Sequence, residues 1–431
     1  MPPVELQPIL DSLLDGQTKG FPQDRPPVRL GEVGALGLRL TEAELDFPVA
    51  VLKRSALEHN AKWMAEFIRR SGVSLCPHGK TTMAPQLFHR QLADGAWGIT
   101  LATVQEVRVA YSHGVKRIIL ANEPLLPGAI RWIQAALDAD PEFDLTCLVD
   151  SQTGIAALEA FAEGRRPIPV LLELGIEGGR TGARTVAAAL ELARAVRASF
   201  RLQLRGVECF EGIVISPDPA ADRDRIRTWL DDLGNLAKAC DGEDLFETAE
   251  VLLSAGGSAY FDLVVQALGP IRLSRPARVV LRSGCYFSHD AGHYRRLLAL
   301  LEERRPEPLP EGPGLLPALE IWGQVLSRPE PGLAFLTMGK RDVSHDLGLP
   351  TPVRWARPGR PDGPWAAPGS WRITTLYDQH ARLELPADAD LQAGDLVGCG
   401  ISHPCTAFDK WQVLFEVDDQ YRVLGAVRTF F

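Results

Sequence analysis

The stretch Ser74-Leu75-Cys76-Pro77-His78-Gly79-Lys80-Thr81-Thr82 carries the first signal for the fold and for a site. It follows a helical pattern and is typical of a buried strand that ends on a lysine. Strand side chains alternate between faces, so Cys76, His78 and Lys80 should point to the same side. An ammonium group at the inward end of a barrel strand loses hydration, and desolvation lowers the pKa of a lysine. Lys80 is therefore a candidate Schiff-base former; the alternative is an exposed lysine with a paired charge.

Strand and helix patterns alternate from there to about residue 290, after an apolar strand at Phe47–Lys53 and a helix over residues 55–70 with Ser55 as its N-cap. Such repeated units imply a parallel sheet, and eight strands favour a closed (β/α)8 TIM-like barrel, with an open doubly wound sheet as the alternative. The expected strands are Ser74–His78, Trp97–Leu101, Arg117–Ala121, Asp144–Val149, Ile168–Leu174, Arg205–Phe210, Glu250–Ser254 and Val279–Ser283.

The pattern changes after residue 300, where a Pro- and Glu-rich stretch, Arg304–Pro317, is typical of an exposed linker. Short alternating segments follow and predict an antiparallel β domain. Three parts are therefore expected: an N-terminal segment, residues 1–54, that partly joins the β domain; a barrel over residues 55–295; and a C-terminal β domain over residues 296–431. The expected β-domain strands are Leu319–Val325, Leu333–Met338, Arg372–Tyr377, Ala381–Leu385, Leu396–Gly400 and Gln412–Val417, with a surface loop at residues 356–371.

Composition excludes several classes of protein. The 431 residues carry a net charge of -9 and no basic run, which argues against a nucleic-acid partner. No apolar run is long enough to cross a membrane, and Met1–Gly20 lacks the pattern of a secretory signal. The seven cysteines are scattered without a CxxC pair, which favours a reducing cytoplasm over a disulfide scaffold.

A glycine pair marks the second candidate site. Ser254-Ala255-Gly256-Gly257-Ser258-Ala259-Tyr260 follows the seventh strand and opens a helix, so free N–H groups there offer a phosphate site. In barrels, phosphate sites often lie in the loops after strands seven and eight. The eighth strand ends in a similar small-residue turn, Arg282-Ser283-Gly284-Cys285-Tyr286. The alternative is a tight turn that needs glycine for a positive φ.

Two further motifs carry side chains suited to a site. Arg180 lies among glycines in the segment Glu173–Gly182 after the fifth strand, where it can reach an anionic oxygen or simply be solvated. In Cys399–Thr406, His403 and Cys405 are two residues apart and should share a face of an extended segment. One imidazole and one thiolate suit a divalent metal, zinc first; the alternative is a packed cysteine beside a surface histidine.

The order of these motifs resembles the fold-type III pyridoxal-phosphate enzymes. The motifs are Pro-His-x-Lys-Thr, Gly-x-x-Gly-x-Arg-x-Gly, Gly-Gly-Ser, Gly-x-Tyr and His-x-Cys, and the resemblance covers roughly residues 47 to 431. Within that family they resemble the branch of D-serine dehydratase, D-threo-3-hydroxyaspartate dehydratase and D-threonine aldolase. The resemblance implies an alanine-racemase-like barrel with a β domain, in a homodimer with its active site at the barrel mouth.

The resemblance also implies roles for individual residues. Lys80 matches the Schiff-base lysine, with His78 beside the cofactor, and Arg180 matches the arginine that contacts the phenolate oxygen of pyridoxal phosphate. His403 and Cys405 match a pair that binds a divalent metal, with zinc first and manganese or magnesium as alternatives. The expected phosphate cup consists of Gly256, Gly257, Ser258, Cys285 and Tyr286.

Two positions depart from the family pattern. Thr82 stands where many relatives have histidine, and the partner of the pyridine nitrogen stays open between Glu211 and Glu208. The His-x-Cys motif is similar to that of the dehydratases, whereas the aldolases have His-x-Asp.

We therefore expect a dehydratase that converts a D-3-hydroxy amino acid such as D-serine into a 2-oxo acid and ammonia. Retro-aldol cleavage to glycine and an aldehyde is the first alternative, and racemisation, which needs no metal, is the next. A pyridoxal-phosphate carrier without catalysis is the non-enzymatic alternative.

Overall fold

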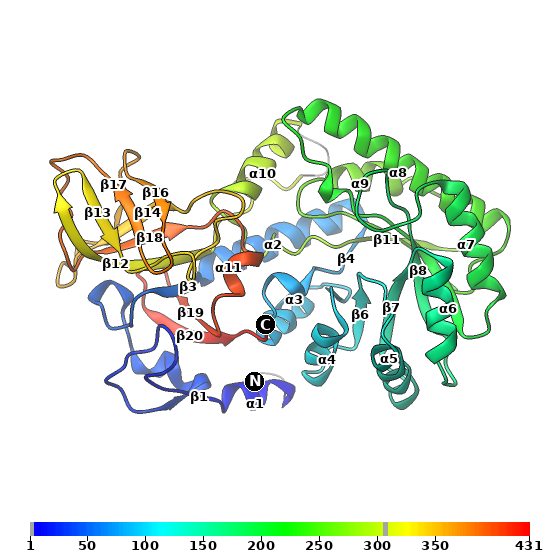
Figure 1. The fold of residues 1–431 in the computed structure, drawn as a ribbon, viewed down its shortest axis with the longest axis horizontal. Helices are drawn as coiled ribbons and strands as arrows, with labels where there is room; N and C mark the ends of the chain where they lie inside the picture. The colour runs from blue at the N-terminus through cyan, green and yellow to red at the C-terminus, as the bar shows by residue number, and fades with distance from the viewer. Residues whose placement is uncertain (1–3, 305–308) are drawn as a thin grey trace.

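The computed structural model describes residues 4–304 and 309–431, which form a parallel barrel and a β domain joined side by side (Figure 1). Part of the expected linker Arg304–Pro317, residues 305–308, lies outside the described residues, as does the start of the expected N-terminal segment. Helix α2 (Arg54–Ser71) leads from the β domain into the barrel, and α10 (His293–Arg304) follows the last barrel strand. Both expected domain types are therefore present.

Eight parallel strands form the barrel, in the order β4-β11-β10-β9-β8-β7-β6-β5. All eight expected strands exist, and the predicted TIM-like fold class is confirmed. Inward apolar side chains of these strands, among them Leu148, form a small buried cluster with Cys76, which follows β4. The strands are β4 (Ser74–Leu75), β5 (Ile99–Leu101), β6 (Arg117–Leu120), β7 (Asp144–Val149), β8 (Ile168–Glu173), β9 (Leu202–Glu208), β10 (Val251–Ala255) and β11 (Ala277–Leu281).

The barrel closes through the residues that follow β4. An isolated parallel bridge joins His78 to Thr100 of β5. The Thr100 amide donates to the Pro77 carbonyl over 2.9 Å, and the Thr100 hydroxyl donates to the Cys76 carbonyl over 2.6 Å. Pro77 has no N–H group to donate, so regular ladder pairing ends before it.

The prediction that a strand runs to His78 and ends on Lys80 is therefore wrong in detail. The strand ends at Leu75, and Lys80 lies in a 3-10 turn, Gly79–Thr81. His78 and Lys80 nevertheless line one pocket, while Cys76 is buried inside the barrel. The shared side thus comes from the turn and from barrel closure, not from strand alternation.

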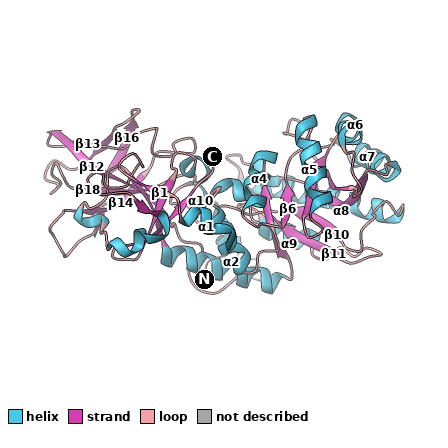
Figure 2. Cartoon of the chain, turned by 90° about the horizontal axis from the view of Figure 1, so that it is seen from below, coloured by secondary structure: helices cyan, strands magenta, loops and turns pink. Residues whose placement is uncertain are grey.

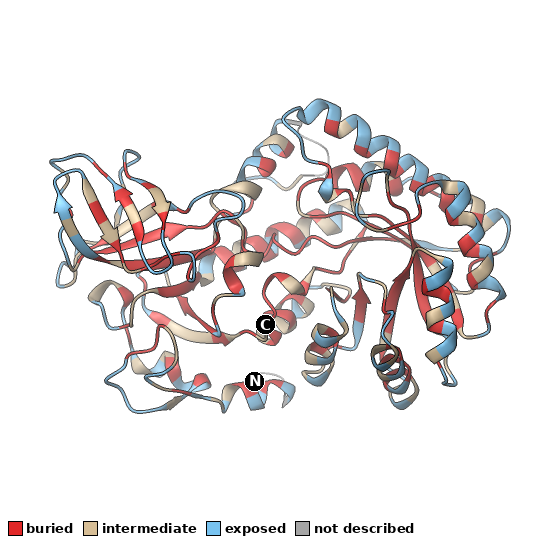
Figure 3. Cartoon of the chain, viewed as in Figure 1, coloured by how far each residue is buried: buried red, intermediate tan, exposed pale blue. Residues whose placement is uncertain are grey.

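Long helices surround the barrel strands, whereas the β domain consists mainly of strands and loops (Figure 2). Figure 3 shows buried residues on the sides of these helices that face the strands and exposed residues on their outer sides. The expected N-cap Ser55 is wrong, because α2 begins at Arg54 with Lys53 as its N-cap. The remaining barrel helices are α3 (Pro85–Ala93), α4 (Val104–Ser112), α5 (Pro127–Ala139), α6 (Gln152–Phe161), α7 (Val186–Ala198), α8 (Pro219–Gly242) and α9 (Phe261–Leu268).

The β domain is built on a mostly antiparallel sheet. Strand β3 (Val49–Lys53) precedes the barrel in sequence but pairs with β12 and β19, so the N-terminal segment joins this sheet. Strands β14, β15 and β20 were not predicted, and β15 lies within the expected loop at 356–371. The strands are β12 (Leu319–Glu330), β13 (Leu333–Leu336), β14 (Thr351–Ala356), β15 (Trp365–Ala366), β16 (Arg372–Leu376), β17 (Ala381–Glu384), β18 (Leu396–Gly400), β19 (Val413–Val417) and β20 (Val423–Arg428).

Among the described residues, no helix combines the length and apolar character needed to cross a membrane.

The Thr100→Val substitution tests the barrel closure. It keeps the shape of the buried side chain but leaves the Cys76 carbonyl without its hydroxyl donor. A buried acceptor without a partner costs about 1–3 kcal/mol, so the urea midpoint of barrel unfolding should fall. The Thr100→Ser variant keeps the hydroxyl and should lose less stability. Tryptophan fluorescence monitors unfolding in both variants. An equal fall of the urea midpoint in both would contradict the role given to this hydrogen bond.

Candidate active site

A pocket opens at the barrel mouth, where the carboxyl ends of the parallel strands meet. Its charged lining comes from the ends of four different strands, which is the usual arrangement of active sites in such barrels. Lys80 follows β4, Arg180 follows β8, Glu208 ends β9 and Arg282 follows β11. The complete lining is His78, Lys80, Ala102, Ala121, Asn122, Leu148, Arg180, Thr181, Glu208, Phe210 and Arg282.

His78 presents an unpartnered nitrogen next to Lys80. Its Nδ1 atom is buried and has no hydrogen-bond partner in the described structure. Burial, helped by the Lys80 charge, holds the pKa of His78 well below its usual value, so the imidazole is neutral at pH 7. A Cβ atom on Gly284 would lie 2.4 Å from the His78 carbonyl, so glycine is required for this close packing. The site thus holds a neutral, incompletely satisfied imidazole beside a lysine.

A buried ion pair forms one wall of the pocket. Arg282 and Glu208 are 5% and 1% exposed and contact each other directly, and Arg282 also donates to the Cys209 carbonyl over 2.7 Å. Burial raises the pKa of Glu208 to about 7, although the neighbouring guanidinium opposes this shift. Glu208, left open above as a partner of the pyridine nitrogen, therefore reaches the pocket together with Arg282. Sequence reasoning had placed Arg282 only in a turn motif.

The glycine pair after β10 holds an anion in this structure. Gly256 has a φ of +92°, which favours glycine. The amides of Gly256 and Gly257 donate to the two carboxylate oxygens of Glu211, over 3.0 and 2.6 Å. Two neighbouring N–H groups directed at one anion are the donor set that a phosphate needs. Glu211 therefore faces the cup rather than the Lys80 pocket, and its role toward a pyridine nitrogen stays a prediction.

The other predicted cup residues divide between different sites. Ser258 accepts a hydrogen bond from the Cys285 amide over 3.2 Å, so both lie beside the glycine pair. Tyr286, in contrast, directs its hydroxyl to Gln91, which donates over 3.4 Å, and lines a separate cavity next to α2. The Tyr286 side chain is therefore not placed in the cup.

The predicted metal pair lies against the residue that follows Lys80. The Cys405 sulfur is 3.3 Å from the Thr81 hydroxyl and 3.6 Å from the Cys285 sulfur. The hydrogen bond with Cys285, and then that with His403, hold the pKa of Cys405 well below its usual value. Pro404 adopts a helical conformation and a short helix begins at Cys405, so the expected extended segment is wrong. The turn still brings His403 and Cys405 together.

Asp346 orients the predicted histidine ligand. Its carboxylate lies 2.6 Å from Nδ1 of His403 and accepts a hydrogen bond of 2.7 Å from the Thr406 hydroxyl. A carboxylate on one ring nitrogen leaves the other available, which is the usual support of a histidine that binds a metal. Sequence reasoning missed Asp346 because it lies 57 residues before His403.

Comparison with known proteins places this site in a family. The alanine racemase N-terminal domain matches residues 52–260, and the serine dehydratase domain matches residues 318–417. The chain is 26% identical to 3-hydroxy-D-aspartate aldolase of Paracoccus denitrificans (strain Pd 1222), over 72% of this chain and 76% of that protein. The chain belongs to the fold-type III pyridoxal-phosphate enzymes. It is a lyase of the D-serine dehydratase and D-threonine aldolase branch.

Two further relatives of this fold-type III enzyme differ in their reactions. The chain is 30% identical to D-threo-3-hydroxyaspartate dehydratase of Delftia sp. (strain HT23), over 32% of this chain and 36% of that protein. Its fold is similar to the crystal structure of D-threonine aldolase from Filomicrobium marinum, with a TM-score of 0.73 and 23% identity over 94% of this chain and 98% of that one.

The residues present fit pyridoxal phosphate. The fold-type III enzyme offers a lysine beside an unpartnered buried nitrogen of His78, and amides of Gly256 and Gly257 that already hold a carboxylate. Arg180 extends to the same pocket and packs over the Phe210 ring at 5.1 Å. Lysine, arginine and anion cup thus lie around one barrel mouth.

Glu211→Gln is expected to tighten the binding of pyridoxal phosphate to the apoenzyme. The carboxylate and the phosphate need the same two amides and repel each other, so removing the charge should lower the dissociation constant on the order of tenfold. Burial raises the pKa of Glu211, so the wild-type carboxyl becomes neutral on acidification sooner than an exposed glutamate. The difference between the two proteins should therefore shrink as the pH falls. Fluorescence titration measures the affinity and its pH dependence, with the exposed Glu159→Gln variant as the control. If Glu211→Gln binds pyridoxal phosphate no more tightly than this control, the proposed competition is contradicted.

Proposed function

We propose that this fold-type III lyase is a dehydratase of D-3-hydroxy amino acids, with D-serine as the simplest substrate. One observation carries the proposal: Cys405 lies 3.3 Å from Thr81, directly after Lys80. A thiolate–imidazole pair therefore lies against the turn that carries the lysine, from where it would act on the substituent of a bound amino acid. Loss of hydroxide needs such assistance, because hydroxide is a poor leaving group.

Pyridoxal phosphate, when bound, supplies an electron sink, and the protein positions and tunes it. Lys80 would hold the cofactor, and its Nζ atom would take the α-proton once released. Proton transfer by a positioned side chain typically contributes about 10²–10⁴-fold. Arg180 would bind an anionic oxygen as a fixed charge, and neutral His78 keeps the pocket free of a further cation.

His403 and Cys405 would hold a divalent ion, which supplies Lewis-acid polarisation of an oxygen. Zinc is the first candidate because the pair offers nitrogen and sulfur, with manganese or magnesium as alternatives. Asp346 fixes the His403 ring through Nδ1 and so holds the ligand orientation. Thr81 contacts the Cys405 sulfur and joins this pair to the lysine turn.

Aldol cleavage is the second candidate, because two relatives that align with 72% and 82% of this chain are named aldolases. Cys405 favours dehydration, since His-x-Cys is the pattern found in the dehydratases.

We also propose that the enzyme acts as a homodimer. Leu125 and Leu126, 52% and 73% exposed in the loop between β6 and α5, would gain from being covered.

Borohydride reduction of the protein with pyridoxal phosphate should fix the cofactor to Lys80. The Lys80→Ala variant should show neither this label nor the visible absorption of the covalently held cofactor. Peptide mass spectrometry locates the label, and exposed Lys62→Ala serves as the control. A label on another lysine in the wild-type protein would exclude the role given to Lys80.

Metal removal tests the reaction itself. Incubation with D-serine, D-threonine and D-3-hydroxyaspartate should give 2-oxo acids and ammonia, measured by chromatography. Chelation, or Cys405→Ala, should abolish turnover while pyridoxal phosphate stays bound, because the barrel mouth is unchanged. Glycine plus an aldehyde would identify an aldolase instead. An unchanged rate for metal-stripped Cys405→Ala would contradict the metal role.

A further inference from the structure

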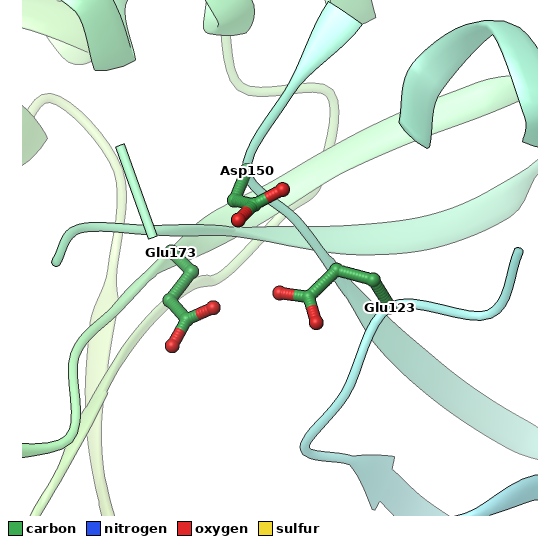
Figure 4. A group of neighbouring side chains, drawn as sticks. All are labelled: Glu123, Asp150 and Glu173. Atoms are coloured by element: carbon green, nitrogen blue, oxygen red, sulfur yellow. The ribbon is translucent and has the colours of Figure 1, made fainter. Parts of the chain in front are cut away.

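Three carboxylates lie together on the barrel rim beside the pocket. Glu123 follows β6, Asp150 follows β7 and Glu173 ends β8, so three neighbouring strands each contribute one acid. One oxygen from each lies within 4.8 Å of the others, and the side chains point toward a common space in Figure 4. None of the three belongs to the site described above.

Existing hydrogen bonds leave open oxygens in this group. The Thr181 hydroxyl donates to Oε1 of Glu173 over 2.7 Å, and the Gly182 amide donates to Oδ2 of Asp150 over 3.1 Å. The other Glu173 oxygen, Oε2, is buried without a partner, and Oε1 of Glu123 is likewise unpartnered. Glu173 is only 4% exposed, so water does not freely compensate it.

The three acids also bring like charges close together. Burial raises the pKa of Glu123 to about 9, and a hydrogen bond with Glu173 and the charges of Glu173 and Asp150 add to this shift. Like charges at this separation in a partly dry site are unfavourable, so a cation or a proton must balance them.

We propose that Glu123, Asp150 and Glu173 bind a hard divalent cation of the magnesium and manganese class. Carboxylate oxygens are the ligands such ions prefer, and three of them leave positions for water. This site differs in chemistry from the nitrogen and sulfur pair of His403 and Cys405. The two sites should therefore bind ions independently of each other.

The ion would fix the loop that carries Arg180. Residues 174–185 connect β8 to α7, and a parallel bridge between Leu174 and Ala183 closes their base. Thr181 and Gly182, directly after Arg180, donate to Glu173 and Asp150. An ion on those carboxylates would hold this loop at the pocket edge. Arg180 is exposed and followed by threonine, so trypsin cleavage after it reports on the loop.

The experiment counts bound Mn²⁺ in the holoenzyme by electron paramagnetic resonance of the free ion. A His403→Ala/Cys405→Ala background removes the other predicted metal site. That protein should bind one Mn²⁺ per chain, with a dissociation constant below about 1 mM, the weak end of protein calcium sites. Glu173→Gln in the same background should weaken binding at least tenfold. Glu177→Gln, an exposed acid in the same loop, should not.

A second readout and a second variant keep the proposal testable if the Glu173→Gln protein does not fold. Mn²⁺ should slow trypsin cleavage after Arg180 in the background protein, and Glu123→Gln should remove this protection. Absence of the ion in the background protein, or binding unchanged by both substitutions, would overturn the proposal and leave a proton shared by the carboxylates. If His403 and Cys405 bind no ion, the wild-type and background proteins should bind the same single Mn²⁺ per chain, and Glu173→Gln should still weaken its binding.

Discussion

Closure of the parallel barrel after β4 is the constraint on which the site depends. The chain at Cys76–His78 is hydrogen-bonded on both sides, with amides donating to Leu281 and Arg282 carbonyls and Thr100 bonding back to Cys76 and Pro77. A proline within this segment ends the regular ladder and lets the chain turn. The 3-10 turn Gly79–Thr81 then carries Lys80 into the mouth. The hydrogen bonds that close the barrel thus also fix the position of Lys80.

The β domain completes the site through a contact with this turn. Cys405 lies against both Thr81 and Cys285, which follow the first and last barrel strands. A separate ion-pair group also joins the two domains, where Arg54 and Arg90 both contact the nearly buried Glu416 of β19. The two ion pairs of Glu416 connect residues more than 300 positions apart. Precise placement of ligands beside the lysine therefore requires both domains.

Electrostatics divides the barrel mouth into two regions. The pocket side carries Arg180 and the buried Arg282, which favour anionic groups such as a cofactor phenolate or a substrate carboxylate. The neighbouring rim carries Glu123, Asp150 and Glu173, which favour a cation. The loop after β8 belongs to both regions, since it holds Arg180 and donates hydrogen bonds to two of the acids. A change of charge at the three acids can therefore influence the position of this loop and of Arg180.

The sequence by itself determined the order of the barrel strands, the presence of a partner β domain, and the motifs at Lys80, Gly256–Gly257 and His403–Cys405. These signals are local, because hydrophobic periodicity and glycine placement act over a few residues. Only the tertiary structure decided that Glu211 faces the glycine amides, that Asp346 orients His403, and that three acids from separate strands converge. Those arrangements depend on strand order and barrel closure, which bring side chains together from distant parts of the chain and so leave no local pattern.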